Sequence, residues 1–161
     1  MREFNRDRYL EIAGNVGVFT SAEIDVIIEI LNVHEKSDGK EYVVFNYKEA
    51  DIILGFIIFG RTPLTEFSWD IYWLVVDLGR QGKGIGGKLI RMCQDFILGN
   101  GDSAILKVET STKKEFAHAR NLYVKQNFKE AGRIPNFYKE NDDLIIYYIA
   151  LTSGSTMSRT I

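Results

Sequence analysis

Apolar residues recur at helical spacing near the start of the chain. The first such segment, residues 2–14, shows a loose helical pattern that Gly14 interrupts. The second is better marked, because Thr20 and Glu23 form a capping box and apolar residues then recur every three or four positions. This pattern predicts a second helix that ends near residues 32–34.

From residue 42 the pattern changes to short runs of β-branched and aromatic residues, which are typical of strands. Runs 42–47 and 53–60 flank a polar KEAD segment, residues 48–51, and predict a hairpin. After a turn that contains Pro63, run 68–76 continues the antiparallel meander.

The order of the later elements predicts one parallel unit. A helical pattern over 84–98 separates strand 68–76 from a strand at 104–110, so these strands run parallel with a right-handed crossover. The fold class is therefore α/β (α+β), a mixed sheet with an antiparallel meander, one parallel βαβ unit and a C-terminal hairpin. The remaining expected elements are a helix at about 114–125 and strands at 128–134 and 144–151.

The composition fits one globular domain. The chain has 161 residues, of which 45% are hydrophobic, enough to bury a sizeable core. We expect residues 1–151 to form a single domain and residues 152–161, rich in serine and threonine, to form a flexible tail.

Charge and hydropathy exclude several classes of partner. A net charge of −2 gives no global reason to expect nucleic acid. No run approaches the roughly 18 apolar residues that a membrane span needs. The N-terminus is too charged to be a signal peptide, so we expect a cytoplasmic protein.

Cysteine and histidine give little indication of chemistry. Cys93 falls within an apolar helical stripe, which predicts core packing rather than nucleophilic duty. His34 and His118 lack partners at ligand spacing, so we expect no metal site.

Four glycines, Gly82, Gly84, Gly86 and Gly87, follow strand 68–76 where the helical pattern begins. Glycine is unfavourable inside helices and strands, which indicates that something comes close to this backbone. A helix N-terminus presents unpaired N–H groups and binds anions, so a phosphate-bearing ligand is the first candidate.

Two known phosphate-binding motifs match the residues of this segment but not the elements that flank it. A dinucleotide fingerprint fits residues 82–87, with Glu109 placed to hold a ribose, but residues 77–81 separate the glycines from the strand and only one βα unit is present. A triphosphate loop fits residues 82–88 but needs a hydroxyl where Leu89 stands. A tight turn that binds nothing is a further alternative.

A third motif has the matching context. The segment VDLGRQGKGIG, Val76 to Gly86, followed by Lys88-Leu89, closely resembles the acetyl-coenzyme A signature of the GCN5-related N-acetyltransferase (GNAT) family. The family's order of elements matches residues from about 20 to 150, although its usual first strand is not evident and Leu78 stands where many members have proline.

The resemblance implies an N-acetyltransferase that moves an acetyl group from acetyl-coenzyme A to a primary amine. The acceptor is a small molecule, an amino acid or a peptide, and transfer is direct, within a ternary complex. The alternatives are a non-catalytic acyl-coenzyme A sensor and a nicotinamide-dependent oxidoreductase. Family habit suggests a homodimer.

The resemblance also implies where the coenzyme binds. Its pyrophosphate lies on backbone amides at the start of the helix, and its pantetheine arm pairs with the free edge of strand 68–76. A backbone N–H near Val76 polarises the thioester carbonyl. The implied cofactor-binding residues are Leu74, Val75, Val76, Gln81, Gly82, Lys83, Gly84, Ile85, Gly86 and Gly87. Lys83 and Lys88 either add charge at the phosphates or are ordinary exposed residues.

The implied catalytic residues are Tyr123, Asp70 and Glu109. Tyr123 stands at the position of the acid that protonates the leaving thiolate. The alternative is that Tyr123 packs in the core. Asp70 or Glu109 is the base for the amine, and each also fits a purely structural role. Phe116 stands where some relatives have an asparagine.

Strand alternation predicts how the strand at 68–76 divides its side chains. One face carries Asp70, Tyr72, Leu74 and Val76, and the opposite face carries Trp69, Ile71 and Trp73. Six aromatic residues of this chain lie near the segments that line the acceptor cleft in relatives. They contact the acceptor, pack in the core or contact a second copy of the chain: Phe67, Trp69, Tyr72, Trp73, Phe137 and Tyr138.

Overall fold

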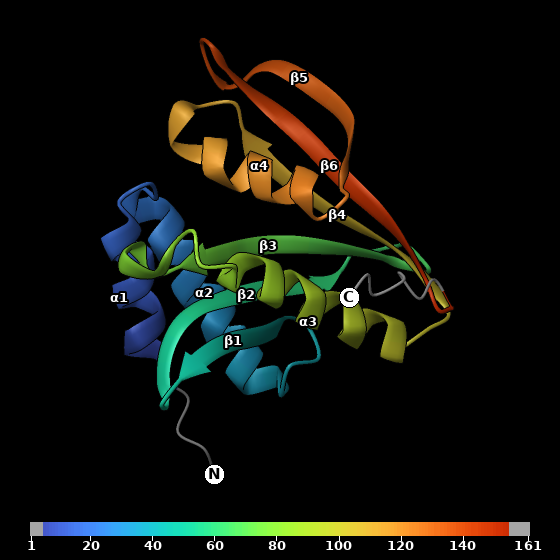
Figure 1. Ribbon diagram of the computed structural model, residues 1–161, viewed down its shortest axis with the longest axis horizontal. Coiled ribbons are helices and arrows are strands. Elements are labelled where there is room, and N and C mark those ends of the chain that lie inside the picture. Colours follow the sequence, from blue (N-terminus) through green and yellow to red (C-terminus); the bar gives the residue numbers. More distant parts are fainter. Residues whose placement is uncertain (1–4, 155–161) are drawn as a thin grey trace.

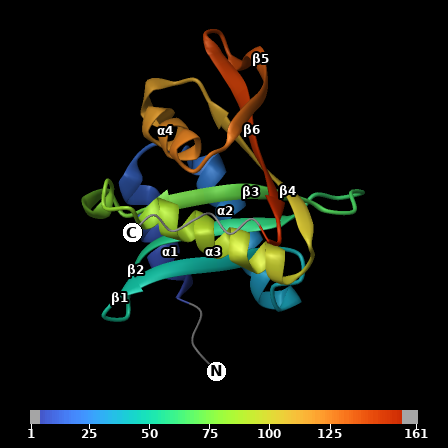
Figure 2. The same ribbon diagram turned by 45° about the vertical axis from the view of Figure 1, so that its right-hand side comes forward.

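A computed structural model describes residues 5–154 as a six-stranded mixed sheet between two layers of helices (Figure 1). The strand order is β1-β2-β3-β4-β6-β5. Helices α1 and α2 pack on one face of the sheet, and α3 and α4 pack on the other (Figure 2). The expected fold class is therefore confirmed. The strands are β1 Val43–Glu49, β2 Ile52–Arg61, β3 Ser68–Val76, β4 Ser103–Ser111, β5 Lys129–Lys139 and β6 Asp142–Thr152.

The helices occur where the hydrophobic pattern predicts them, with shifted ends. They are α1 Arg6–Val16, α2 Ser21–Ser37, α3 Ile85–Gly99 and α4 Ala117–Lys125, with short 3₁₀ turns at Leu78–Arg80 and Lys114–Phe116. The expected capping box of α2 is present, since Thr20 and Glu23 bond each other's backbone N–H groups. The expected end of α2 was wrong: the helix runs on to Ser37, because Asp38 adopts a left-handed φ of 52° and its N–H closes on the His34 carbonyl.

The expected hairpin between the first two strands is also present. Ala50 and Asp51 make its turn, with φ values of 45° and 66°, the left-handed pair that a tight two-residue hairpin requires. Strand β2 is buried along most of its length, and Phe56 and Phe59 are fully inaccessible to solvent. This strand therefore forms the centre of the first half of the sheet.

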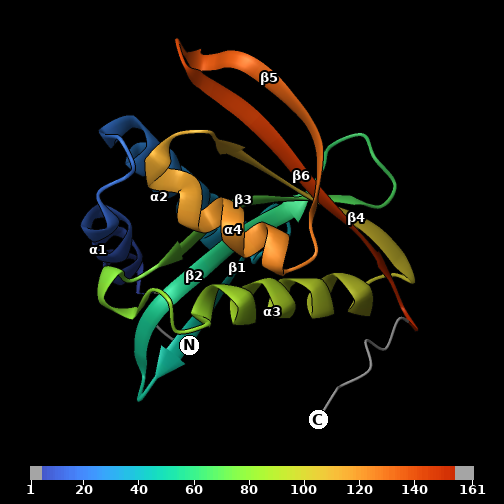
Figure 3. The same ribbon diagram turned by 45° about the horizontal axis from the view of Figure 1, so that its top comes forward.

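Strands β3 and β4 pair in parallel only over a short distance. Their register runs from Ser68 opposite Ile105 to Ile71 opposite Val108. Beyond Ile71 they diverge, and α4 lies over the gap (Figure 3). The second half of β3 therefore has one edge that no strand covers.

Strand β3 carries one extra residue, Tyr72, relative to β2. Trp73 pairs with Ile58, whereas the next residue of β2, Phe59, pairs with Ile71. Such a bulge reverses the alternation of side chains beyond it.

The predicted alternation along β3 was therefore wrong. Trp69 and Ile71 pack in the core beneath α3, and beyond the bulge Leu74 and Val76 pack against that same core. Tyr72, Trp73 and Val75 pack with α1 and α2 instead. Leu74 and Val76 thus lie on the face opposite Tyr72, not beside it.

The C-terminal hairpin, β5 and β6, closes the sheet, and β6 extends to Thr152, which pairs with Ser103. Residues 155–161, most of the expected tail, lie outside the described residues. Within residues 5–154, no helix is both long and apolar enough to cross a membrane.

Cys93 packs in the core, as its place in an apolar stripe predicted. Its side chain lies on α3 among residues that face the sheet, with no exposed surface. Burial raises the pKa of the Cys93 thiol well above its ordinary value. The thiol is therefore neutral and inert rather than a nucleophile.

Candidate active site

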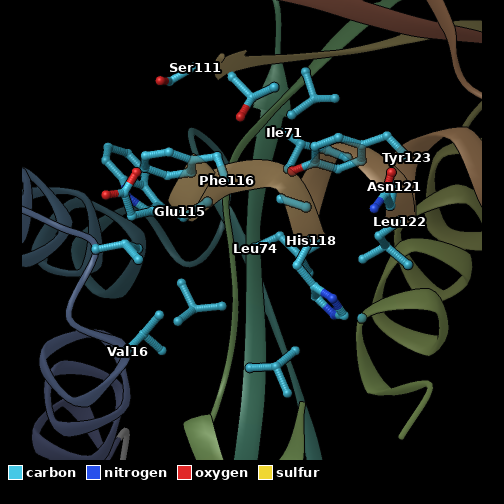
Figure 4. Close-up of a pocket in the computed structure, with 18 of the residues that line it drawn as sticks. Val16, Ile71, Leu74, Ser111, Glu115, Phe116, His118, Asn121, Leu122 and Tyr123 are labelled. Carbon is cyan, nitrogen blue, oxygen red and sulfur yellow. The ribbon is translucent and has the colours of Figure 1, made fainter. Parts of the chain in front are cut away.

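A cleft of about 1250 Å³ opens where β3 and β4 separate. Its walls come from the α1–α2 loop, the second half of β3, the glycine loop, the start of α3, the end of β4, α4 and the tip of the β5–β6 hairpin (Figure 4). The cleft brings together both groups of residues that the sequence singles out, the glycine segment and the residues Asp70, Glu109 and Tyr123.

The glycine loop leaves open space above its backbone. Gly82 and Gly84 have φ values of 75° and 80°, which glycine adopts without strain, and a Cβ atom at either would meet no atom within 4 Å. Gly84 precedes α3 without any side-chain cap. The first N–H groups of α3 have no helical acceptor, so this loop can receive an anion.

Gly86 and Gly87 lie close to side chains of the chain itself, whereas the sequence predicted that a phosphate-bearing ligand would approach them. A Cβ atom on Gly86 would lie 2.6 Å from Leu122 Cδ2, and one on Gly87 would lie 2.9 Å from Gln126 Nε2. These two glycines let α4 approach α3 closely. The glycine pattern therefore serves helix packing as well as an open loop.

The cations at this end of the cleft differ from those that the motif suggested. The Lys88 ammonium donates to the Tyr47 hydroxyl at 3.0 Å and lies over its ring, so it is directed toward β1. Arg80 and Arg91 line the cleft instead. Both lie outside the expected site residues, although each stands within or just after the signature.

The uncovered edge of β3 presents backbone groups of Leu74 and Val76. The Asp77 N–H donates to the Leu54 carbonyl of β2 at 2.9 Å. Neighbouring residues of a strand direct their N–H and C=O groups to opposite sides, so those of Leu74 and Val76 face the cleft. Gln81 Nε2 donates to the Val76 carbonyl on that side, at 3.2 Å. Val75 pairs with β2 instead.

Tyr123 lies at the wall of the cleft formed by α4. Its side chain is 5% exposed and packs against Phe128 and Tyr147. Figure 4 shows its hydroxyl turned toward Ile71 of β3. Burial raises the pKa of the Tyr123 phenol, so the phenol keeps its proton at neutral pH.

Asp70 and Glu109 share one cation, Lys107, which the expected site residues did not include. Lys107 Nζ lies 2.9 Å from Asp70 Oδ1 and 2.7 Å from Glu109 Oε1. The parallel register places Lys107 directly opposite Asp70, so only knowledge of the strand pairing could have found this cluster. Burial lowers the pKa of the Lys107 ammonium, but hydrogen bonds to Glu109 and Asp70 outweigh it, and the net pKa is raised.

The charged cluster lies on the opposite face of the sheet from α3 and α4. Lys107 and Glu109 alternate along β4 with Leu106 and Val108, whose side chains pack in the core beneath α3. The cleft therefore has two sides, with the glycine loop and Tyr123 on one and the carboxylates on the other.

Three of the six aromatic residues line the carboxylate side, namely Tyr72, Trp73 and Tyr138. Burial, together with the nearby carboxylates of Glu109, Asp142 and Glu23, raises the pKa of Tyr138. Trp69 is buried in the core, and Phe67 and Phe137 are exposed away from the cleft. His118 and Asn121 of α4 also line the cleft (Figure 4), and no pattern in the sequence pointed to either as a site residue.

Among residues 5–154, no group of three or more His, Cys, Asp or Glu side chains is arranged to hold a metal ion. The groups that the cleft offers for chemistry include a buried phenol, carboxylates and backbone amides. Such groups suit proton transfer and the binding of an anionic cosubstrate.

Comparisons with known proteins show the family to which the chain belongs. A family model for the acetyltransferase (GNAT) domain matches residues 37–130, more than half of the chain. A structure from Desulfovibrio desulfuricans, assigned to the GNAT family of acetyltransferases, is 30% identical, with a TM-score of 0.82 over 88% of this chain and 89% of that one. Among curated proteins, none matches the sequence.

Two more distant structures share the fold. The ribosomal-protein-S18-alanine N-acetyltransferase of Escherichia coli is 19% identical, with a TM-score of 0.70 over 94% of this chain and 90% of that one. A Salmonella typhimurium protein with its cofactor acetyl-CoA is 18% identical, with a TM-score of 0.69 over 92% and 91%.

The fold and the two-sided cleft define an acyltransferase that uses a coenzyme A thioester. The chain belongs to the GNAT acetyltransferase family. It is thus an acetyl-coenzyme A-dependent N-acetyltransferase, as the Val76 to Gly86 signature predicted.

Proposed function

We propose that this protein transfers the acetyl group of acetyl-coenzyme A directly to the primary amine of a small molecule, an amino acid or a peptide, within a ternary complex. The observation that carries the proposal is the two-sided cleft. One side offers amides and a phenol, and the other offers carboxylates, so donor and acceptor can meet without a covalent enzyme intermediate.

The coenzyme side is supported by backbone geometry. The amides from Gln81 to Gly87 receive the pyrophosphate, since Gly82 and Gly84 leave room above the start of α3. The pantetheine arm pairs with Leu74 and Val76, whose polar groups face the cleft. Arg80 and Arg91 add positive charge beside the phosphates.

The transfer step needs an oxyanion donor and an acid. The Val76 N–H polarises the thioester carbonyl while the amine nitrogen forms its bond to the carbonyl carbon. The carbon–sulfur bond then breaks, and Tyr123 gives its proton to the leaving thiolate. Solvent returns that proton to Tyr123 after the products leave.

The acceptor side supplies a base and an apolar wall. A carboxylate, Glu109 or Asp70, takes the proton that the amine loses, directly or through one water. Tyr72, Trp73 and Tyr138 offer the rest of the acceptor an aromatic surface. We therefore favour an acceptor with one amine on a partly apolar body over a polycation.

The test is release of free thiol from acetyl-coenzyme A with five amines: phenethylamine, L-alanine, the dipeptide Ala-Ala, spermidine and kanamycin. We expect thiol and N-acetyl product in equal amounts, with phenethylamine or the dipeptide fastest. Calorimetry with acetyl-coenzyme A runs in parallel. Binding without transfer to any amine would favour the acyl-coenzyme A sensor, and absence of binding would overturn both functions.

A further inference from the structure

Lys107 is the cation between the two candidate bases, Asp70 and Glu109. The two carboxylates differ in how many of their oxygens are engaged. Asp70 has both oxygens engaged, Oδ1 with Lys107 and Oδ2 with the Thr62 hydroxyl at 2.6 Å. Glu109 is engaged through Oε1, and its other oxygen has no partner among residues 5–154. The Glu109 side chain is 43% exposed, against 12% for Asp70.

The position of Lys107 follows from where the strands part. It lies opposite Asp70, one pair before the last pair of the parallel ladder, Ile71 with Val108. Its ammonium therefore stands at the fork of the cleft, and Glu109 is the next residue on the same face of β4, just beyond the fork. An ammonium anchored by Asp70 can hold Glu109 at the point where the cleft opens.

The groups that face Lys107 come from three other strands as well as its own. Asp70 and Tyr72 approach from β3 and Glu109 from β4. Tyr148 of β6 is its cross-strand partner, and Glu130 of β5 lines the same shallow pocket while paired with Arg133. Only Asp70 and Glu109 lie within ion-pair distance of the ammonium among the described residues.

We propose that Lys107 is the positioning residue that makes Glu109 the carboxylate that accepts the amine's proton, with Asp70 serving as the anchor of Lys107. This inference rests on the proposed transfer to an amine. Lys107 holds Oε1 and leaves the second oxygen of Glu109 to the acceptor. The ammonium also offsets the repulsion between the two carboxylates, since it lies within ion-pair distance of both.

The first experiment compares variants by the pH dependence of kcat/KM, with the fastest amine of the panel. In Lys107→Met we expect a roughly 10-fold loss near neutral pH and an acidic limb moved upward by about one pH unit, with acetyl-coenzyme A affinity unchanged. Lys107→Arg restores most of the rate. Lys129→Met, which removes an exposed lysine outside the cleft, leaves the profile unchanged.

The second comparison decides between the carboxylates. Glu109→Gln is expected to lower kcat/KM about 100-fold, whereas Asp70→Asn lowers it less than about 10-fold. Near-UV circular dichroism checks that each variant keeps its fold. The reverse order of effects, or an acidic limb that does not move in Lys107→Met, overturns the proposal.

A readout without turnover separates this proposal from the proposed function. Carboxyl ¹³C NMR follows the titration of Asp70 and Glu109 in the wild type, Lys107→Met and Lys107→Arg, with the Asn and Gln variants as assignments. We expect both midpoints to rise in Lys107→Met and to return in Lys107→Arg. Unchanged midpoints overturn the role of Lys107 whether or not any amine is acetylated. If the midpoints shift but the protein acetylates no amine, Lys107 still holds Glu109. The proposed function is then overturned, and with it the role of Glu109 in transfer.

Discussion

The two sides of the cleft are built by different means. The coenzyme side consists largely of backbone from one continuous segment, from Leu74 to Gly87, in which the open edge of β3 leads into the glycine loop. The acceptor side consists of side chains from α2, β3, β4 and the β5–β6 hairpin. A site made of backbone follows from local sequence, whereas a site made of side chains follows from strand register.

The two sides should therefore respond differently to substitution. On the coenzyme side, a side chain added to a glycine strains the backbone and covers the amides. On the acceptor side, removal of one charge leaves its partners unbalanced while the fold persists. Measurements of coenzyme affinity and of turnover distinguish these two kinds of failure.

Loss of the Tyr123 hydroxyl is expected to have the largest effect. Tyr123→Phe should lower kcat on the order of 1000-fold, because the leaving thiolate loses its proton donor while the ring still fills its place. Acetyl-coenzyme A affinity, measured by calorimetry, should not change. Tyr147→Phe is the matched control, since Tyr147 packs against Tyr123 but does not line the cleft.

The pH dependence of Tyr123 has a definite sign. Its pKa in the folded protein is raised above the ordinary tyrosine value of about 10, so the acid stays protonated through the neutral range. Tyr123→Phe should therefore lower kcat equally at every pH from 6 to about 9. A loss confined to the alkaline end of that range would contradict the assigned role.

A side chain at Gly84 is expected to have the next largest effect. Gly84→Val places a β-branched residue at a left-handed φ, at a cost of about 1–2 kcal/mol, and covers amides that face the anion. The Kd for acetyl-coenzyme A should rise about 100-fold by calorimetry.

Gly79→Val is the control for Gly84→Val. Gly79 also has open space around it, but its φ is not left-handed. Coenzyme affinity should stay near the wild-type value. Equal losses in the two variants would mean that bulk near the loop, rather than the backbone of the loop, sets the affinity.

Truncation of Tyr138 should have a smaller effect, confined to the acceptor. Tyr138→Ala is expected to raise the KM of phenethylamine about 5-fold through lost aromatic contact, with the KM of acetyl-coenzyme A unchanged. Ile134→Ala is a fair control, because Ile134 lies on the same strand, is 45% exposed against 49% for Tyr138, and does not line the cleft. A rise in both KM values would show that Tyr138 serves both sides.

The effect farthest from catalysis concerns stability at alkaline pH. The pKa of Cys93 is raised in the folded protein, so its contribution to stability is complete below about pH 8.5, the ordinary thiol pKa, and declines as pH rises. The expected slope is about 1.4 kcal/mol per pH unit well above that value. Urea unfolding at pH 8 and pH 10 should show a shallower decline for Cys93→Ala, and an identical decline would contradict burial of the thiol.

The strand, glycine loop and helix start that form the coenzyme side could be predicted from the sequence because they are continuous in the chain. The glycines and Gln81 lie next to one another in the chain, and a strand followed by a helix is the context that such a loop needs. The parallel βαβ unit and both hairpins followed from periodicity and turn residues in the same way.

The acceptor side could not be predicted from the sequence, because a bulge of one residue and the register of two strands determine it. The bulge at Tyr72 has no separate signature in the sequence, yet it sets the face of every later residue of β3. The contact of Lys107 with Asp70 depends on a parallel register between strands that α3 separates. On the coenzyme side, the approach of Leu122 to Gly86 likewise could not be predicted, because it depends on how α4 packs against α3.

The bulge at Tyr72 also makes the catalytic arrangement sensitive to the length of one strand. Deleting Tyr72 would bring Trp73 into register with its neighbours as an ordinary strand residue, while Leu74 and Val76 keep their pairs on β2 and their place in the core beneath α3. The bulge comes directly after Ile71, the last residue of β3 that pairs with β4, so without its local bend β3 would run on beside β4 and the uncovered edge would shorten. A single inserted residue thus helps one strand part from its neighbour and keep open the edge that the cleft needs.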